Sequence, residues 1–585
     1  MEEDRILKLQ KQIERLKKSV KKQRYGLVWM DIPEAFEDDV ENKLPILKEV
    51  PELAIKNDNG KPIHILIEGD NYHALTCLNY THKGKIDIIY IDPPYNTGSD
   101  GFRYKDKRII DKFPDGTLVP KDHPFRHSYW LSFMKKRLEL AADLLKDSGV
   151  IFISIGEDEV ANLKLLSDEV FGESNLLSHI ARIAKTASNK GNYFAPSIDF
   201  VLVYAKNVNL LTLFKDEVNE KLYTKKDENG FYRDDVALYQ AALDPMRGCS
   251  NQRYFIECPD GELVIPPGQV MPEGKKDAAF VKPQSSSDKV WRWSYTTYLE
   301  KKNLLVYKKT KRSPLLNQEG NRAKWNIYTK SYLEERSESG TAPRNFLDEF
   351  INRKGADFLK TLDINFSYPK PVDLIKHLIR ITNKDKDIII LDFFAGSGTT
   401  GQAVMELNQE DDGSRQFIMV TNNEDNIMSE VCYPRIQRII NGYKNQKGEK
   451  FDGFGNSLKY YKTAFVGRNS ILNTTDDDKV ELAHNAGELL AIAENTLELV
   501  KQNDHYQLFE DSNKDKYTAI YFREELEKFD DFVEMVKRLQ KKTTVYVFSW
   551  GNEELSSDFA YLKGVKIKTI PLPILEIYKN IYNLE

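Results

Sequence analysis

Six short apolar runs, with predicted helices between them, constrain the fold of this chain most strongly. The runs are HILIEGD (64–70), IDIIYID (86–92), GVIFISI (149–155), FVLVYAK (200–206), DIIILDF (387–393) and QFIMV (416–420). Helices are expected at 71–80, at 128–146, from 157 onward, at 372–381 and from 399 onward. Strands that are apolar on both faces and alternate with helices are typical of a parallel sheet covered on both sides. The sequence therefore predicts an α/β fold on a parallel sheet.

This alternation breaks between about residues 207 and 360, where the chain is rich in loops and basic residues. Within 301–330, nine Lys and Arg face a single Asp or Glu, although the whole chain carries a net charge of −5. The near-neutral total therefore conceals a basic insert within a more acidic scaffold. Three aromatic residues before this cluster are Trp291, Trp293 and Tyr295. An alternative interpretation places them at alternating core and surface positions of a strand.

The two ends of the chain differ from the segments between them. Five apolar residues near the amino terminus follow coiled-coil spacing, which predicts a short amphipathic helix or a dimerising seam: Ile6, Leu9, Ile13, Leu16 and Val20. From about residue 465, an amphipathic helix near 481–499 and the β-rich runs 517–522 and 543–550 predict a small separate α/β module.

Composition narrows the class of protein. Four cysteines lie scattered without a C-x-x-C pair, so neither a secreted disulfide framework nor a zinc ribbon is expected, and no metal site is predicted. The amino terminus is charged, and no uncharged apolar run reaches the roughly 18 residues of a membrane span. These features predict a cytoplasmic protein with no membrane partner.

The first candidate site is the tetrapeptide Asp92, Pro93, Pro94 and Tyr95, directly after the second apolar run. Ligands bind at the carboxyl ends of strands in parallel sheets. The Asp92 carboxylate and the Pro93 carbonyl can accept the two hydrogens of an amino group on an aromatic base, while Tyr95 offers a ring face for stacking. A proline-braced turn without a ligand is the alternative interpretation.

The second candidate site is the glycine-rich segment 391–401, which follows the fifth run and opens a helix. Its glycines spell G-x-G-x-x-G, so the backbone can approach a ligand closely, and a dinucleotide site is a competing interpretation. A tight turn without a ligand is the other alternative. No Lys-Ser or Lys-Thr pair follows Gly398, so the segment is not a P-loop. Beyond the next run, Glu424 is placed to hydrogen-bond ribose hydroxyls.

Together these motifs resemble the amino-methyltransferases of DNA that use S-adenosylmethionine, and D-P-P-Y before the glycine loop is the permuted order of the β group. More segments agree with that family, and they extend the resemblance over roughly residues 25 to 465 to the Mod (modification) subunit of Type III restriction-modification systems. These segments are GLVWMDIPE (26–34), EGDNYHAL (68–75), the strand-helix unit 149–172, the WRW run, FSYPKPVDLIKHLI (366–379) and FIMVTNNEDN (417–426).

The resemblance implies a Rossmann-like methyltransferase sheet with a circularly permuted motif order, an inserted target-recognition region and a small C-terminal α/β module. The implied segments are an N-terminal helical segment (1–44), the catalytic half of the core (45–206), the target-recognition insert (207–360), the cofactor-binding half of the core (361–464) and the C-terminal module (465–585).

It also implies the residues of the site, of which Asp92, Pro93, Pro94 and Tyr95 form the catalytic set. The residues implied for S-adenosylmethionine are Asp70, Asn71, Lys370, Asp392, Phe394, Gly396, Gly398, Thr399 and Glu424, with Asp425 as the alternate ribose ligand. The residues implied for DNA phosphate are Arg292, Lys308, Lys309, Lys311 and Arg312. A solvated charged face is the alternative for this basic cluster.

The implied activity is methylation of the N6 amino group of a flipped-out adenine in double-stranded DNA. Cytosine-N4 methylation and a solitary adenine methyltransferase are alternatives within the same chemistry, and a homodimer and a Type III restriction (Res) subunit are the implied partners. An NAD-dependent dehydrogenase would use the glycine loop but leaves the D-P-P-Y motif unexplained. A DNA-binding subunit that has lost catalysis is disfavoured because both motifs are intact.

Overall fold

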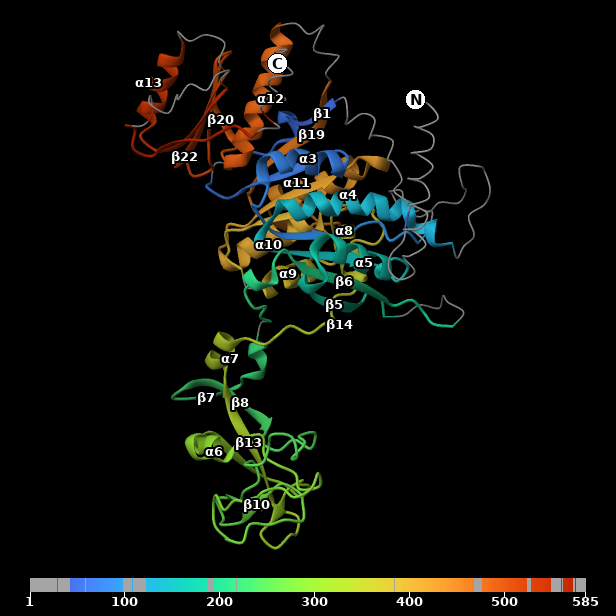
Figure 1. Cartoon of the computed structure of the whole chain (residues 1–585), viewed down its shortest axis with the longest axis vertical. Helices are drawn as coiled ribbons and strands as arrows, with labels where there is room; N and C mark the ends of the chain where they lie inside the picture. Colours follow the sequence, from blue (N-terminus) through green and yellow to red (C-terminus); the bar gives the residue numbers. More distant parts are fainter. Residues whose placement is uncertain are drawn as a thin grey trace, which may run out of the picture. The chain divides into compact units, whose positions relative to one another are not determined.

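A computed structural model describes two compact units of the chain (Figure 1). The described residues are 29, 43–57, 59–97, 108, 123–186, 193–216, 218–382, 384–467, 476–522, 528–548, 559, 561–571 and 574. One unit comprises Met1–Leu213 and Arg344–Glu585, and the other is Phe214–Pro343. The predicted N-terminal coiled-coil residues, and 26–34 apart from Trp29, lie outside the described residues.

The first unit is built on a ten-stranded sheet in the order β1-β19-β2-β16-β15-β3-β4-β6-β5-β14. The strands are β1 (Lys43–Glu49), β2 (Ile63–Glu68), β3 (Ile86–Ile91), β4 (Leu145–Ile155), β5 (Leu176–Ile183), β6 (Ile198–Ala205), β14 (Phe346–Leu347), β15 (Ile389–Asp392), β16 (Gln416–Thr421) and β19 (Ser457–Gly467). All six predicted apolar runs are therefore strands of one sheet, although they come from both sides of the second unit in the sequence.

The sheet is mixed, so the prediction of a parallel sheet is wrong toward both of its ends. At one end, β1 runs antiparallel to β19. Strands β19, β2, β16, β15, β3 and β4 are parallel, whereas β6 runs antiparallel to β4 and β5 antiparallel to β6. The prediction lacked β5, in which Ser178, His179 and Arg182 interrupt the apolar residues. Only residues 184–197 join β5 to β6, and an antiparallel pair needs no crossover helix.

Helices cover both faces of this sheet. They are α3 (Asn71–His82), α4 (Ser128–Leu144), α5 (Val160–Phe171), α8 (Asn352–Thr361), α9 (Val372–Ile381), α10 (Thr399–Asp411) and α11 (Tyr433–Asn441). Leu75 of α3 and Leu138 of α4 share one apolar cluster with Ile418 of β16. Met419, the next residue of β16, points to the other face. If Gly401 of α10 carried a Cβ atom, that atom would lie 2.7 Å from the Met419 Cε.

The second unit has its own apolar core and two small sheets. One sheet has the order β11-β13-β8-β7 and the other β12-β10-β9. Its elements are β7 (Lys225–Asp227), β8 (Gly230–Ala237), β9 (Ile256–Glu257), β10 (Leu263–Ile265), α6 (Tyr295–Lys301), β11 (Leu305–Lys309), β12 (Leu316–Asn317), β13 (Trp325–Tyr332) and α7 (Leu333–Ser339). The Trp291 side chain is fully buried in this core, which supports a structural role for that aromatic residue.

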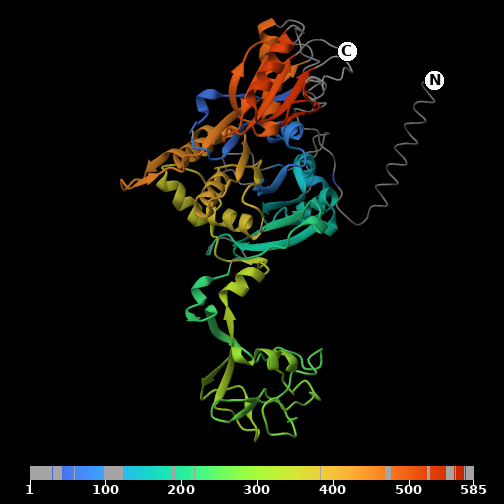
Figure 2. The ribbon, with the colours of Figure 1, turned by 90° about the vertical axis from the view of Figure 1, so that its left-hand side faces the viewer.

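The C-terminal segment is predicted to be a separate module. Its described part has an apolar cluster of its own, which includes Tyr521 and Phe532, and α12 (Asp476–Glu494) also packs into the core around the central sheet. Leu489 and Ile492 of α12 belong to the same cluster as the α3 and β16 side chains. The Lys85 ammonium, just before β3, donates to the Ala493 carbonyl at 2.6 Å. Figure 2 shows the C-terminal sheet in orange-red, with strands β20 (Glu498–Gln502), β21 (Tyr506–Glu510), β22 (Lys516–Phe522), β23 (Lys542–Phe548) and β24 (Val565–Ile567) beside α12 and α13 (Phe529–Leu539).

Two short strands, β17 (Gly442–Lys444) and β18 (Lys450–Asp452), form a hairpin after α11. Among the described residues, no helix has the length and apolarity that crossing a membrane requires. The five segment boundaries given by the sequence stay predictions, and the compact unit at 214–343 lies within the predicted insert of 207–360.

Candidate functional site

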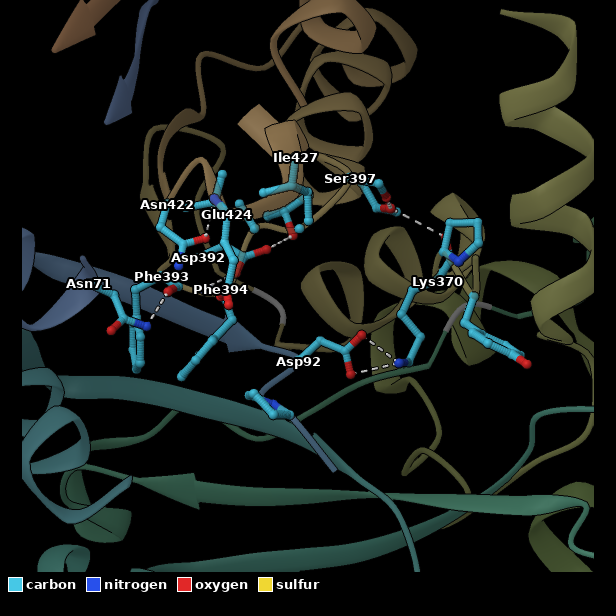
Figure 3. Close-up of a pocket in the computed structure, with 18 of the residues that line it drawn as sticks. Asn71, Asp92, Lys370, Asp392, Phe393, Phe394, Ser397, Asn422, Glu424 and Ile427 are labelled. Carbon is cyan, nitrogen blue, oxygen red and sulfur yellow. Dashed lines mark hydrogen bonds and ion pairs between the residues drawn. The ribbon is translucent and has the colours of Figure 1, made fainter. Parts of the chain in front are cut away.

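The two sequence motifs meet at one edge of the central sheet. Strand β3 ends at Ile91, so Asp92 begins the loop that follows, and β15 ends at Asp392. The two strands are parallel neighbours, with Ile88 paired to Ile390. Because the carboxyl ends of parallel neighbours lie at the same edge, the D-P-P-Y loop and the glycine loop line a common pocket (Figure 3).

The D-P-P-Y loop is fixed by neighbouring helices. The Trp130 indole of α4 donates to the Pro94 carbonyl at 2.8 Å, and the Asn96 amide donates to the buried Glu159 carboxylate at 2.5 Å. His127 also contacts Glu159 at 2.5 Å, and this hydrogen bond raises the pKa of His127. These contacts fix the backbone of the loop and therefore the position of Asp92.

Tyr95 packs closely against the turn that follows β4. A Cβ on Gly156 would lie only 2.8 Å from Cδ2 of the Tyr95 ring. Among the described residues, the buried Tyr95 hydroxyl has no hydrogen-bond partner. Burial, reinforced by the charge of Asp92, holds the pKa of Tyr95 well above its ordinary value. The ring is therefore a neutral, positioned surface beside the catalytic candidate.

The glycine loop takes a conformation that glycine favours. Gly396 and Gly398 have φ values of 51° and 76°, and the Gly398 amide donates to the Ala395 carbonyl at 2.7 Å. The guanidinium of Arg435, fully buried on α11, supports the loop from behind. It donates to the Ser397 carbonyl at 3.1 Å and to Thr399 Oγ1 at 2.9 Å. Burial lowers the pKa of Arg435 to about 10, so it remains charged at neutral pH.

Asp392 is a buried carboxyl group at the start of this loop. Its Oδ2 accepts from Thr400 Oγ1 at 2.5 Å, and its Oδ1 accepts from the Phe394 amide at 3.0 Å. Burial raises the pKa of Asp392 to about 7, although both hydrogen bonds favour the ionised form. Asp392 is therefore partly protonated at neutral pH.

The G-D-N segment closes another side of the pocket. Asp70 caps α3 by accepting from the Tyr72 amide at 2.8 Å. Buried Arg137 of α4 lies 3.2 Å from Asp70 and also donates to the Asn71 side chain. The Asn71 amide in turn donates to the Phe393 carbonyl at 2.9 Å. These contacts join α3 and α4 to the glycine loop.

Lys370 contacts the D-P-P-Y loop directly. Its ammonium lies 2.6 Å and 2.5 Å from the two carboxylate oxygens of Asp92 (Figure 3). The Lys370 side chain is 8% exposed and that of Asp92 is 26% exposed. The sequence assigns Lys370 to the cofactor, and nothing in its spacing predicts this ion pair.

The pocket encloses about 940 Å³, counting its open mouth. Most of the residues predicted for catalysis and for the cofactor line it, and Pro93, Tyr95 and Gly398 are not among its lining residues. The predicted residues in its wall are Asp70, Asn71, Asp92, Pro94, Lys370, Asp392, Phe394, Gly396, Thr399 and Glu424. Asp425 does not line it, so Glu424 is the better placed of the two candidate ribose ligands.

The same wall contains further residues that the sequence did not single out as site residues, although several of them lie within the predicted motifs. These are Tyr90, Arg108, Phe133, Phe366, Ser367, Tyr368, Pro369, Phe393, Ala395, Ser397, Thr400, Thr421, Asn422 and Ile427. Tyr90 belongs to the apolar run of β3, and Phe133 to an amphipathic helix, so both read as core positions. The residues beside Lys370 could have been found from the sequence, because they belong to segment 366–379, on which the family resemblance rests.

The predicted phosphate-binding residues of the second unit differ in their surroundings. Lys311 and Arg312 are exposed, whereas Lys308 forms an ion pair of 3.0 Å with Asp234, and Arg292 is half-buried. Lys309 lies over the Trp325 ring at 5.0 Å. Lys309 and Lys311 also line a shallow groove with Arg322 and Lys324, which the sequence prediction did not single out.

Comparison with known proteins connects this geometry to a family. A family model described as DNA methylase matches residues 86–431. The EcoPI Mod subunit of a Type III restriction-modification enzyme from Escherichia phage P1 is 33% identical over 401 residues, which cover 63% of this chain and 59% of that protein. The StyLTI Mod subunit from Salmonella typhimurium is 32% identical over 62% of this chain and 53% of its own length. The chain thus spans little more than half the length of these two relatives.

A third relative matches along nearly its whole length. The Type II methyltransferase M.KpnI from Klebsiella pneumoniae is 30% identical over 436 residues, which cover 72% of this chain and 94% of that protein. Among solved structures, the cytosine-N4-specific PvuII DNA methyltransferase aligns with a TM-score of 0.30 at 11% identity, over 64% of this chain and 87% of its own. The sequence matches, which span both motifs, decide the family.

Proposed function

The chain belongs to the DNA methylase family, and from that premise we propose that it transfers a methyl group from S-adenosylmethionine to the N6 amino group of adenine in double-stranded DNA. One observation carries the proposal, namely that the Asp92 carboxylate and the glycine loop line the same pocket. The D-P-P-Y form and the similarity to Type III Mod subunits favour adenine over cytosine. An NAD-dependent dehydrogenase would leave this shared pocket unexplained.

The pocket fits S-adenosylmethionine. Positive φ angles at Gly396 and Gly398 leave the backbone open to close approach, and the exposed Glu424 carboxylate can accept hydrogen bonds from ribose hydroxyls. Phe394 adds an apolar wall for the adenine ring of the cofactor. When bound, the cofactor supplies an electrophilic methyl group on a positively charged sulfur.

The residues of the D-P-P-Y loop then act on the target base. An adenine amino group is a poor nucleophile because its lone pair is delocalised into the ring. By accepting its two hydrogens, the Asp92 carboxylate and the Pro93 carbonyl favour a tetrahedral nitrogen and localise the lone pair. The amino group is buried in duplex DNA, so the base must be flipped out, and Tyr95 offers the surface on which it stacks.

The test is methyl transfer from labelled S-adenosylmethionine to duplex DNA by the whole chain. We expect Asp92→Asn to lower turnover at least about a hundredfold while calorimetry shows cofactor binding largely unchanged, because the acceptor charge is lost but the glycine loop is intact. The exposed Asp385→Asn is the matched control. Full turnover by Asp92→Asn would refute the assignment.

The identity of the methylated nucleoside separates the alternatives. Digestion of the product and mass analysis should give N6-methyladenine, whereas N4-methylcytosine would support the runner-up. Calorimetry with NAD in place of S-adenosylmethionine should show no binding.

We further propose that the chain acts as a homodimeric modification subunit with a Type III restriction (Res) partner, on the basis of its similarity to Mod subunits. Light scattering of the purified chain tests the dimer, and co-purification from cells that make both subunits tests the partner. A solitary methyltransferase would methylate DNA without any such partner.

A further inference from the structure

The ion pair between Lys370 and Asp92 joins two segments that are far apart in the sequence. Lys370 lies in the P-K-P segment directly before α9, and in the sequence the whole second unit separates it from Asp92. Its ammonium contacts both oxygens of the Asp92 carboxylate, at 2.6 Å and 2.5 Å, and also lies 5.0 Å from the centre of the Tyr95 ring. A buried ammonium costs much desolvation energy unless it is paired in this way. The pairing is therefore specific to this carboxylate.

The Lys370 backbone is held as firmly as its side chain. A Cβ on Gly355 of α8 would lie 2.7 Å from the carbonyl oxygens of both Pro369 and Lys370, so only glycine allows α8 to approach this closely. On the other side, Thr399 Oγ1 donates to the Lys370 carbonyl at 3.4 Å. The ammonium thus approaches Asp92 from a backbone fixed between α8 and the glycine loop.

The groups around Asp92 are otherwise mostly acidic or phenolic. Asp392 faces it from β15, Tyr90 from β3 and Tyr95 from the same loop, and the charge of Asp92 contributes to raising the pKa of each of these groups. Arg182 of β5, whose charge also acts on Tyr90 and Tyr95, is engaged by Asp199 of β6 at 2.7 Å. Lys370 is therefore the countercharge that stabilises an ionised Asp92.

We propose that Lys370 is a positioning residue that keeps Asp92 ionised and oriented toward the target amino group, and that it does not serve chiefly as a cofactor contact. The inference rests on the proposed role of Asp92 in methyl transfer. A carboxylate offers about four acceptor positions, so the ammonium leaves room for the hydrogen of an amino group.

The experiment compares Lys370→Met, Lys370→Arg and the exposed control Lys360→Met in methyl transfer across pH. We expect Lys370→Met to lower kcat at least about tenfold at neutral pH and to move the acid limb of the pH profile to higher pH, because an adjacent cation favours the charged carboxylate. The dissociation constant for S-adenosylmethionine should stay within about twofold. Lys370→Arg should restore the acid limb and part of kcat.

A raised dissociation constant with an unmoved acid limb would overturn the inference in favour of a cofactor contact. If Lys370→Met does not fold, Lys370→Arg still decides, because a folded variant with wild-type kcat would show that the ammonium geometry does not matter. Asp92→Asn in the same assay separates the two proposals. Its full activity would refute the proposed function, whereas its inactivity beside a wild-type pH profile for Lys370→Met would refute only the positioning role.

Discussion

Asp392 shows how one buried residue makes stability depend on pH. Burial raises its pKa from 3.8 to about 7, so between these values the folded protein keeps a proton that the unfolded chain has lost. The stabilising contribution is therefore complete below about pH 4 and is lost as the pH rises through 7. We expect Asp392→Asn to remove this dependence, which amounts to at most about 4 kcal/mol.

Urea denaturation of both proteins from pH 4 to 8 measures this effect. As the pH rises in that window, the unfolding free energy of the wild type should fall relative to that of the variant. Parallel curves would show that the Asp392 carboxyl group titrates alike in the folded and unfolded chains.

Individual residues were predictable from the sequence where a motif fixed them. Asp92 and Gly396 line one pocket because strand ends and glycine turns carry local signals. The partner of Lys370 was not predictable, because the pairing depends on how the P-K-P segment folds back over the loop after β3. Asp392 stood in the glycine motif, but its burial depends on packing by α10.

At the scale of elements, the junction between β4 and α5 should control the D-P-P-Y loop. A Cβ on Gly156 would lie 2.8 Å from the Tyr95 ring, so Gly156→Ala must displace the ring. If Tyr95 stacks on the flipped base, we expect turnover to fall about tenfold or more without a change in cofactor affinity. The matched control is Gly274→Ala, whose Cβ would meet only an ordinary contact at 3.6 Å. Equal turnover of both variants would contradict a positioned Tyr95.

The elements themselves were predicted best where burial was complete. Strands such as β3 are buried at every residue and give unbroken apolar runs, so the sequence located them. β5 mixes buried and half-exposed positions, so its pattern was too weak to detect, and the direction of β6 was assigned wrongly as a result.

At the scale of the whole molecule, the second unit is expected to hold DNA by its exposed basic residues. Lys311, Arg312 and Arg322 are exposed, whereas the charge of Lys308 is taken up by Asp234. We expect the triple change of these three exposed residues to Gln to reduce the slope of log affinity against log salt by up to about three, since each phosphate contact contributes about 0.9. Lys308→Gln should change that slope little, and equal effects of both variants would place the DNA contact elsewhere.

The broad organisation was predictable from charge and periodicity, since the basic insert interrupts the α/β alternation. The sequence did not predict that α12 and the central sheet share one core. The pattern of an amphipathic helix shows which face is buried but not what that face packs against.

The strand order also bears on how the protein is made. β2 and β3 follow each other in the chain, yet β16 and β15 lie between them in the sheet. During synthesis, the first half therefore leaves the ribosome with a gap two strands wide, which only residues beyond the second unit can fill. A message cut short anywhere before β16 should therefore yield a chain whose central sheet cannot be completed.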